Sequence, residues 1–415
     1  MRRSHAVAAA IEREFEALRE EPGVAVDRTI IGKGSAEAPA ALLRPVATGP
    51  TLGDVYDAYM SDPTHDWSPT TRTAYVTTRR VVLSVLGEST PIRAITRADC
   101  RGLVEVLRAL PRHASKVYPG LTPREAAARA RAEGRTDLIN AANVNAYLNK
   151  LGGIFNWAVK EEVIDRNPSV GLRLPDPTLR RDKRLPFSTA QLQAIFSAPL
   201  YTGCKDDGPG YGVVGPNRPK NARFWIPLVG LFGGLRLNEV CQLDVADIKT
   251  VEGVTCFVVT AASDAPQTDK RLKTSSSERV IPVHPQLLSL GFVEFVERRA
   301  TTGAVKLFGE IELGATGYRS TTFSAWFARF LRRSGGYAPR TCFHSFRHTF
   351  RDGLREARID RDIAMTLGGW AHQGGSNGAA SVSDAYGSGY RMPTLFEAIS
   401  RVEYSGLDLS ALRAS

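Results

Sequence analysis

The sequence predicts a mainly α-helical protein, with an N-terminal helical bundle followed by a mixed α+β domain that is mostly helical. Three observations support this fold class. Residues 51–172 repeat apolar positions at three- and four-residue spacing, which is typical of amphipathic helices. Residues 253–262 and 277–284 are the two segments that look like strands, which predicts a small antiparallel sheet. Residues 173–186 hold three prolines and five basic residues, and this composition predicts an exposed connector between the two domains.

The N-terminal part divides into two predicted regions. The first is an N-terminal segment over 1–50, in which residues 6–20 are predicted to form an amphipathic helix and 21–50 a loose linker. Its start resembles a secretion signal, but charged residues at 12–14 interrupt the apolar stretch. The bundle over 51–172 is expected to contain four or five helices, with N-caps at Thr51, Ser68, Thr96 and Asn143.

The second domain is predicted over residues 187–402, followed by a C-terminal tail at 403–415. It opens with a capped helix, and a long loop rich in Gly, Pro and Asn follows at 203–222. The remaining expected helices are an apolar one at 224–234, a second one at 234–248 and a helical region from Thr321 onward.

Composition favours a polyanionic partner. The formal net charge is +11 over 415 residues, which suits nucleic acid first and an acidic membrane surface second. No apolar run approaches the roughly 20 residues that span a bilayer, so no membrane association is expected. The five cysteines are scattered and never form CxxC, which predicts a reduced, cytoplasmic protein without a metal site. No cofactor is expected, and consistent with this the sequence has no phosphate-binding loop of the GxxxxGK[ST] type and no cluster of acidic metal ligands.

Residues 343–350 contain the most informative segment. On a helix, His344 and Arg347 share one face, while Phe343, Phe346 and Phe350 lie on another that can be buried. A buried helix that presents a His/Arg pair can grip a phosphate, because Arg offers a planar fork and His can donate or shuttle a proton. The alternative for the pair alone is a solvated polar face.

Three further segments carry candidate groups. Arg236 follows two glycines at the expected start of a helix, and Glu239 can hold its guanidinium; the alternative is a surface ion pair. Lys273 lies in a polar turn between the predicted strands, where Lys270 is a rival and a solvated loop lysine is the alternative. Tyr386 follows a glycine-rich stretch and is preferred over Tyr390; a tyrosine that anchors a loop is the alternative.

These segments, taken in order, resemble the tyrosine recombinases of the phage integrase family. The resemblance rests on Gly-x-Arg-x-x-Glu, a hairpin Lys, His-x-x-Arg-His and a late Tyr, and it covers about residues 51–402. It implies that Tyr386 attacks a scissile phosphate and forms a 3′-phosphotyrosyl bond, without metal or ATP. Arg236 and Arg347 would then bind the non-bridging oxygens, Lys273 would protonate the leaving 5′-oxygen, and His344 would assist proton transfer. Glu239 would orient Arg236.

One position departs from the family pattern. The family commonly has Leu-Gly-His ahead of the tyrosine, and here Gly369 stands where the His is expected. Some relatives use Trp at this place, so Trp370 is the first choice and His372 the second. If the departure reflected a decayed active site, the chain would be only a DNA-binding protein.

The resemblance also predicts partners. A bundle and a catalytic domain that close around double-stranded DNA are expected, with a homotetramer on synapsed DNA and a monomer in solution. The helix that follows Tyr390 would dock on a neighbouring subunit or pack on its own domain. A type IB topoisomerase is the competing enzyme class, since it shares the ester chemistry. Candidate DNA contacts are Arg72, Arg180, Arg181, Lys183 and Arg184.

Overall fold

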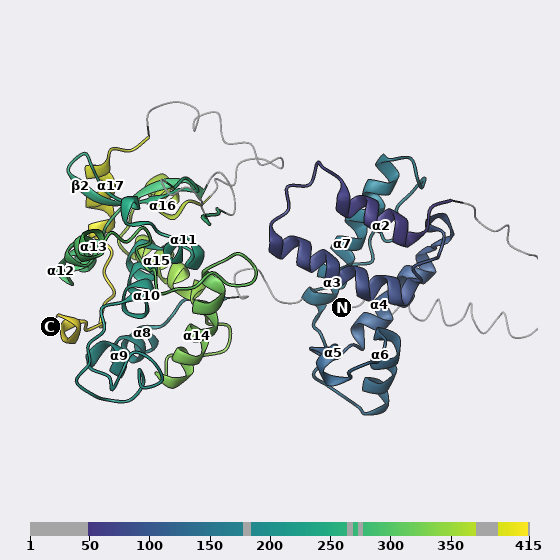
Figure 1. The fold of residues 1–415 in the computed structure, drawn as a ribbon, viewed down its shortest axis with the longest axis horizontal. Coiled ribbons are helices and arrows are strands. Elements are labelled where there is room, and N and C mark those ends of the chain that lie inside the picture. The colour runs from purple at the N-terminus through teal and green to yellow at the C-terminus, as the bar shows by residue number, and fades with distance from the viewer. Residues whose placement is uncertain (1–48, 177–183, 264–268, 273–276, 371–388, 414–415) are drawn as a thin grey trace, which may run out of the picture. The chain divides into compact units, whose positions relative to one another are not determined.

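The computed structural model describes residues 49–176, 184–263, 269–272, 277–370 and 389–413. Within these residues two hydrophobic cores form, one from residues 52–164 and one from residues 187–412 (Figure 1). The predicted helix at 6–20 lies outside the described residues, and the predicted domain boundaries remain predictions. No helix in the described part of the chain combines the length and the apolar character needed to cross a membrane.

The N-terminal core is a helical bundle. Its elements are α2 (Leu52–Ser61), α3 (Pro69–Leu86), the 3-10 turn η1 (Ile92–Ala94), α4 (Arg97–Arg108), α5 (Ala114–Val117), α6 (Pro123–Ala132) and α7 (Ala141–Lys160). The predicted N-caps at Thr51, Ser68 and Thr96 are confirmed, since each side chain accepts a hydrogen bond from a backbone N–H of the first helical turn.

The predicted N-cap at Asn143 is wrong. Asn140 caps α7 instead, and its side-chain oxygen accepts from the Asn143 backbone N–H at 2.9 Å. Asn143 thus supplies one of the free donors that a cap must satisfy. The sequence also did not predict α6, whose buried side is made of alanines, because small residues give a weak apolar pattern.

The second core is built mainly from helices. They are α8 (Thr189–Phe196), α9 (Pro199–Thr202), α10 (Ala222–Gly233), α11 (Leu237–Cys241), α12 (Pro285–Ser289), α13 (Phe292–Thr301), α14 (Ser320–Arg333), α15 (His344–Glu356), α16 (Arg361–Gly368), α17 (Met392–Ser400) and the 3-10 turn η6 (Ser410–Leu412). Figure 1 shows α10, α11 and α15 near one another in the middle of this body, and α10 packs against both of the others.

Close contact between α10 and α15 depends on two glycines. A Cβ on Gly230 would lie 2.8 Å from the Phe343 ring, and one on Gly234 would lie 2.2 Å from the Phe350 ring. Gly234 also ends α10 with a φ of 63°, a left-handed conformation that favours glycine. The predicted buried face of α15 is confirmed, because Phe343, Phe346 and Phe350 are all buried. The two glycines therefore let the phenylalanine face of α15 pack closely against α10.

A three-stranded antiparallel sheet lies beside these helices, which confirms the predicted small antiparallel sheet. The strands β1 (Ile248–Val251), β2 (Val254–Val259) and β3 (Arg279–Pro282) pair in chain order, with Lys249 opposite Cys256 and Phe257 opposite Ile281. The sequence predicted β2 and β3 but not β1, whose first residue, Ile248, was placed at the end of a predicted helix over 234–248.

That predicted helix stops early for a local reason. The Asp247 carboxylate accepts from the Asp244 backbone N–H at 2.8 Å, which starts a 3-10 turn, η3 (Val245–Asp247), after α11. Aspartate competes with helical hydrogen bonding in this way.

The C-terminal helix packs on its own domain in this structure. Leu395 and Ile399 of α17 are buried in the second core. Leu409 and Leu412, which fall in the predicted tail 403–415, belong to the same core. Of the two alternatives for this helix, packing on its own domain is therefore the one present here.

Candidate active site

The first turn of α15 places Arg347 at the end of α10. Its side chain is buried, and its Nη1 donates to the Gly234 carbonyl at 2.7 Å. Its Nη2 donates to the Gly368 carbonyl at the end of α16. The guanidinium is thus fixed by two helix C-termini, whose carbonyl groups favour a cation.

Arg236 lies just beyond the same helix end. It is the N-cap residue of α11, and its Nη1 donates to Glu239 Oε1 at 2.5 Å and to Ser277 Oγ at 3.1 Å. The Glu239 carboxylate also accepts from the Arg236 backbone N–H at 2.8 Å. Because Arg347 binds the carbonyl two residues before Arg236, the two predicted arginines converge on one place.

A third arginine, which the sequence analysis did not single out, completes the group. Arg279 begins β3, and its Nη2 donates to Glu239 Oε2 at 2.8 Å. Its Nε donates to the Leu367 carbonyl at 3.3 Å. Glu239 therefore bridges Arg236 and Arg279, and it is a buried ion-pair centre instead of a surface partner. The signal available in the sequence was a charged residue directly before the apolar residues of a predicted strand.

The electrostatics of this group favour an anion. Burial, together with the positive charges of Arg236 and Arg279, lowers the pKa of Arg347 to about 9. Burial opposes ionisation of Glu239, but the nearby Arg279 and Arg236 outweigh it and hold the pKa of that carboxyl below its ordinary value. Three guanidinium groups surround a single carboxylate, so an added phosphate group relieves repulsion among them.

His344 shares the site as predicted. It begins α15 and lines the same hollow as Arg347, a cavity of about 400 Å³. Burial and the surrounding charges of Arg184, His348, Arg347 and Arg236 lower the pKa of His344 to about 4. Its imidazole is therefore neutral at neutral pH, and it can donate one ring N–H to an oxygen.

The neighbourhood of Gly369 explains the departure from the family pattern. Gly369 ends α16 with a φ of 56°, and a Cβ there would lie 2.8 Å from the Cδ of Arg279. A histidine at this position would be strained and would collide with that arginine. The next residue, Trp370, instead lies with its ring 4.6 Å from the Arg347 guanidinium carbon, a cation–π contact.

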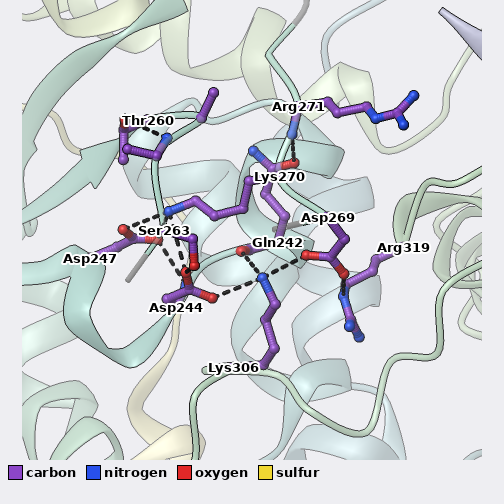
Figure 2. Close-up of polar contacts among 12 residues, drawn as sticks. Gln242, Asp244, Asp247, Thr260, Ser263, Asp269, Lys270, Arg271, Lys306 and Arg319 are labelled. Atoms are coloured by element: carbon purple, nitrogen blue, oxygen red, sulfur yellow. Dashed lines mark hydrogen bonds and ion pairs between the residues drawn. The ribbon is translucent and has the colours of Figure 1, made fainter. Parts of the chain in front are cut away.

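Of the two lysines proposed for the hairpin turn, only Lys270 lies within the described residues; Lys273 lies outside them. Lys270 is buried, and its Nζ donates to both carboxylate oxygens of Asp247 at 2.8 Å. Figure 2 shows the ion-pair chain that continues from Lys270 through Asp244, Lys306 and Asp269 to Arg319. Lys270 is thus engaged in a structural network, which leaves Lys273 as the better candidate for a group that reaches a ligand.

Several other predicted residues lie outside the described residues: Tyr386, His372, Arg180, Arg181 and Lys183. Tyr390, the rival nucleophile, is 37% exposed just before α17. Arg184 is exposed, and its charge acts on His344. Arg72 is an exposed residue of α3 in the bundle. The described residues contain no group of three or more His, Cys, Asp or Glu that could hold a metal ion.

Comparison with known proteins agrees with this geometry. Residues 228–375 match the family model described as "Phage integrase family". The structure is similar to the Tn1549 transposon integrase in complex with a circular intermediate DNA, with a TM-score of 0.52, 18% identity, and coverage of 78% of this chain and 92% of that one. It is also similar to a lambda integrase tetramer bound to a Holliday junction, with a TM-score of 0.51, 17% identity, and coverage of 90% and 89%. No curated protein sequence matches the chain at a significant level.

The chain therefore has the fold of these integrases, and its arginine cluster and His344 lie within residues 228–375, the segment that matches the phage integrase family model.

Proposed function

We propose that this protein is a site-specific DNA recombinase that breaks and rejoins strands through a 3′-phosphotyrosyl intermediate, with Tyr386 as the nucleophile. The observation that carries the proposal is the convergence of Arg236 and Arg347, which are distant in sequence, beside His344 inside the family domain. The reaction needs neither metal nor ATP, since the phosphodiester energy is kept in the tyrosyl ester.

In the proposed cleavage step, the Tyr386 hydroxyl gives its proton to the neutral imidazole of His344. Its oxygen bonds to the scissile phosphorus, and the bond from phosphorus to the 5′-oxygen breaks. Lys273 donates a proton to that oxygen, which leaves as a 5′-hydroxyl. A 5′-hydroxyl from another strand then attacks the phosphotyrosine, and the tyrosine leaves as a hydroxyl. No net bond energy is lost between the two steps.

The site residues supply electrostatic stabilisation. A free tyrosine has a pKa of about 10, so ionising it at neutral pH costs roughly 4 kcal/mol without help. Arg236 and Arg347 lower that cost by binding the non-bridging oxygens where negative charge accumulates. Losing one such donor costs about 2.7–4 kcal/mol in activation free energy in other enzymes. Trp370 is proposed to donate its indole N–H to the same phosphate, and Glu239 holds Arg236 in place.

Double-stranded DNA is the proposed partner, and a homotetramer on synapsed DNA is the proposed active assembly. The similar structures support this assignment, since they are described as integrases bound to DNA, one of them as a tetramer on a Holliday junction. Arg184 and Arg72 are proposed phosphate contacts, together with Arg180, Arg181 and Lys183.

Trapping of a covalent protein–DNA adduct tests the proposal. A nicked duplex that carries the recombination site loses its short 5′-hydroxyl fragment after cleavage, so the adduct accumulates and shifts on a denaturing gel. Tyr386→Phe is expected to abolish the adduct, whereas the matched control Tyr390→Phe is expected to keep it. An adduct that persists in Tyr386→Phe but vanishes in Tyr390→Phe contradicts the assignment of the nucleophile.

A further inference from the structure

The hollow beside Arg347 contains more positive groups than one phosphate requires. His344, Arg347 and Trp370 line it, and so do three residues that the proposed chemistry does not use: His348, Arg351 and Arg361. Among the described residues, no carboxylate lines this hollow. It therefore extends the site along α15 with groups suited to a further anion.

Arg351 contacts an aromatic ring and a sulfur, and it forms no ion pair with a carboxylate among the described residues. Its guanidinium carbon lies 4.5 Å from the Trp370 ring, and its Nη1 lies 3.2 Å from the Met365 sulfur. The adjacent carboxylate, Asp352, pairs instead with Arg355 at 2.9 Å. Burial, followed by the like charges of Arg355 and Arg361, lowers the pKa of Arg351. Because Arg351 has no ion pair among the described residues and lies near two like charges, it is suited to an incoming anion.

The two other groups face the same hollow. His348 lies one helical turn after His344, and their ring centroids are 5.2 Å apart. Arg361 is the first residue of α16 and is exposed. Neither forms an ion pair within the described part of the chain. Trp370 contacts both Arg347 and Arg351, so one indole fixes the spacing of the two guanidinium groups.

We propose that Arg351, His348 and Arg361 form a second anion subsite, which holds the DNA phosphate next to the scissile one on the same strand. The proposal rests on the proposed function, because it takes the phosphate at Arg347 to be the scissile one. Residues four apart on a helix have Cβ atoms about 5–6 Å apart, so Arg351 is displaced from Arg347 toward a neighbouring group of the strand. The subsite thus sets the register of the strand relative to the nucleophile.

Salt dependence of DNA binding gives the first test. With a duplex that carries the site, Arg351→Gln is expected to make the slope of log affinity against log salt shallower by about 0.9, the value for one phosphate contact. Arg355→Gln is the matched control, since this residue is on the same helix but is exposed and already paired. Its slope is expected to stay unchanged. Equal slopes for wild type and Arg351→Gln overturn the proposal.

Uncharged methylphosphonate linkages show which DNA phosphate Arg351 contacts. Single methylphosphonates are placed at the scissile position and at each flanking phosphate, and equilibrium binding is measured for both proteins. In wild type, the substitution at one flanking phosphate is expected to weaken binding several-fold, and Arg351→Gln is expected to show no further loss there. Additive losses at every position, or coupling at the scissile phosphate alone, contradict a second subsite. If Arg351→Gln fails to fold, Arg361→Gln provides the same comparison from an exposed side chain.

The readout separates this inference from the proposed function. Failure of the recombinase proposal appears as the absence of a covalent adduct with wild-type protein. Failure of the subsite appears in equilibrium binding, which needs no cleavage and is measured equally well with Tyr386→Phe.

Discussion

Glu239→Gln tests whether one buried carboxylate holds the arginine cluster together. In the structure the carboxylate is 4% exposed and accepts from Arg236 at 2.5 Å and from Arg279 at 2.8 Å. The amide keeps the shape but removes the negative charge, which leaves three guanidinium groups facing one another. Removing one partner of a buried ion pair costs about 3–5 kcal/mol. Because the Arg236 side chain is 26% exposed, part of the repulsion is screened, and the lower end, about 3 kcal/mol, is expected.

The assay is urea unfolding of the purified protein, first in chloride buffer and then with added sulfate. A sulfate ion in the site replaces the missing negative charge, so it is expected to restore more stability to Glu239→Gln than it adds to wild type. Sulfate also stabilises proteins generally, and this effect is measured with Glu88→Gln, whose carboxylate is exposed and paired with Arg79. That control is expected to lose less than about 1 kcal/mol. A loss below about 1 kcal/mol in Glu239→Gln, or an equal response to sulfate in all three proteins, refutes the electrostatic argument.

Three further predictions concern the second core. Gly234→Ala is expected to destabilise the protein by about 2–5 kcal/mol in urea unfolding, because the residue has a positive φ and a Cβ there would collide with the Phe350 ring. Gly253 also has a positive φ but has open space around it, so Gly253→Ala should cost only about 1–2 kcal/mol. Burial lowers the pKa of His284 to about 4, so the unfolded chain binds a proton that the folded chain rejects. His284 should therefore contribute a fall of about 1.4 kcal/mol per pH unit to the free energy of unfolding between pH 6.5 and 4. His284→Gln should remove that share of the slope and leave the similar share of His344, whose pKa is also lowered to about 4. Lys270→Met is expected to lower the free energy of unfolding by about 3–5 kcal/mol, because Asp247 loses its buried partner. A second change, Asp247→Leu, should recover part of that loss. A larger loss in the double variant than in Lys270→Met counts against the network.

Local physics accounts for what the sequence predicted well. Side-chain caps such as Thr51 and Thr96 satisfy backbone donors three residues away, so their signal is contained in a few letters. The same holds for α15, where the spacing of its phenylalanines separates a buried face from the His344 and Arg347 face. Local reasoning failed where two signals competed within one turn, as with Asn140 and Asn143, and where a carboxylate ended a helix early, as with Asp247.

The sequence by itself determined the helical class, the small sheet, and the order of groups that led to Arg236, His344 and Arg347; Tyr386 and Lys273 remain predictions from it. Only the tertiary structure brought Arg279 onto Glu239 and placed Trp370 against two arginines. It also showed that Lys270 is neutralised in the interior. The physical reason is that burial and charge pairing depend on residues far apart along the chain. A short segment encodes its own caps and faces, but it does not encode which distant carboxylate or ring will meet it.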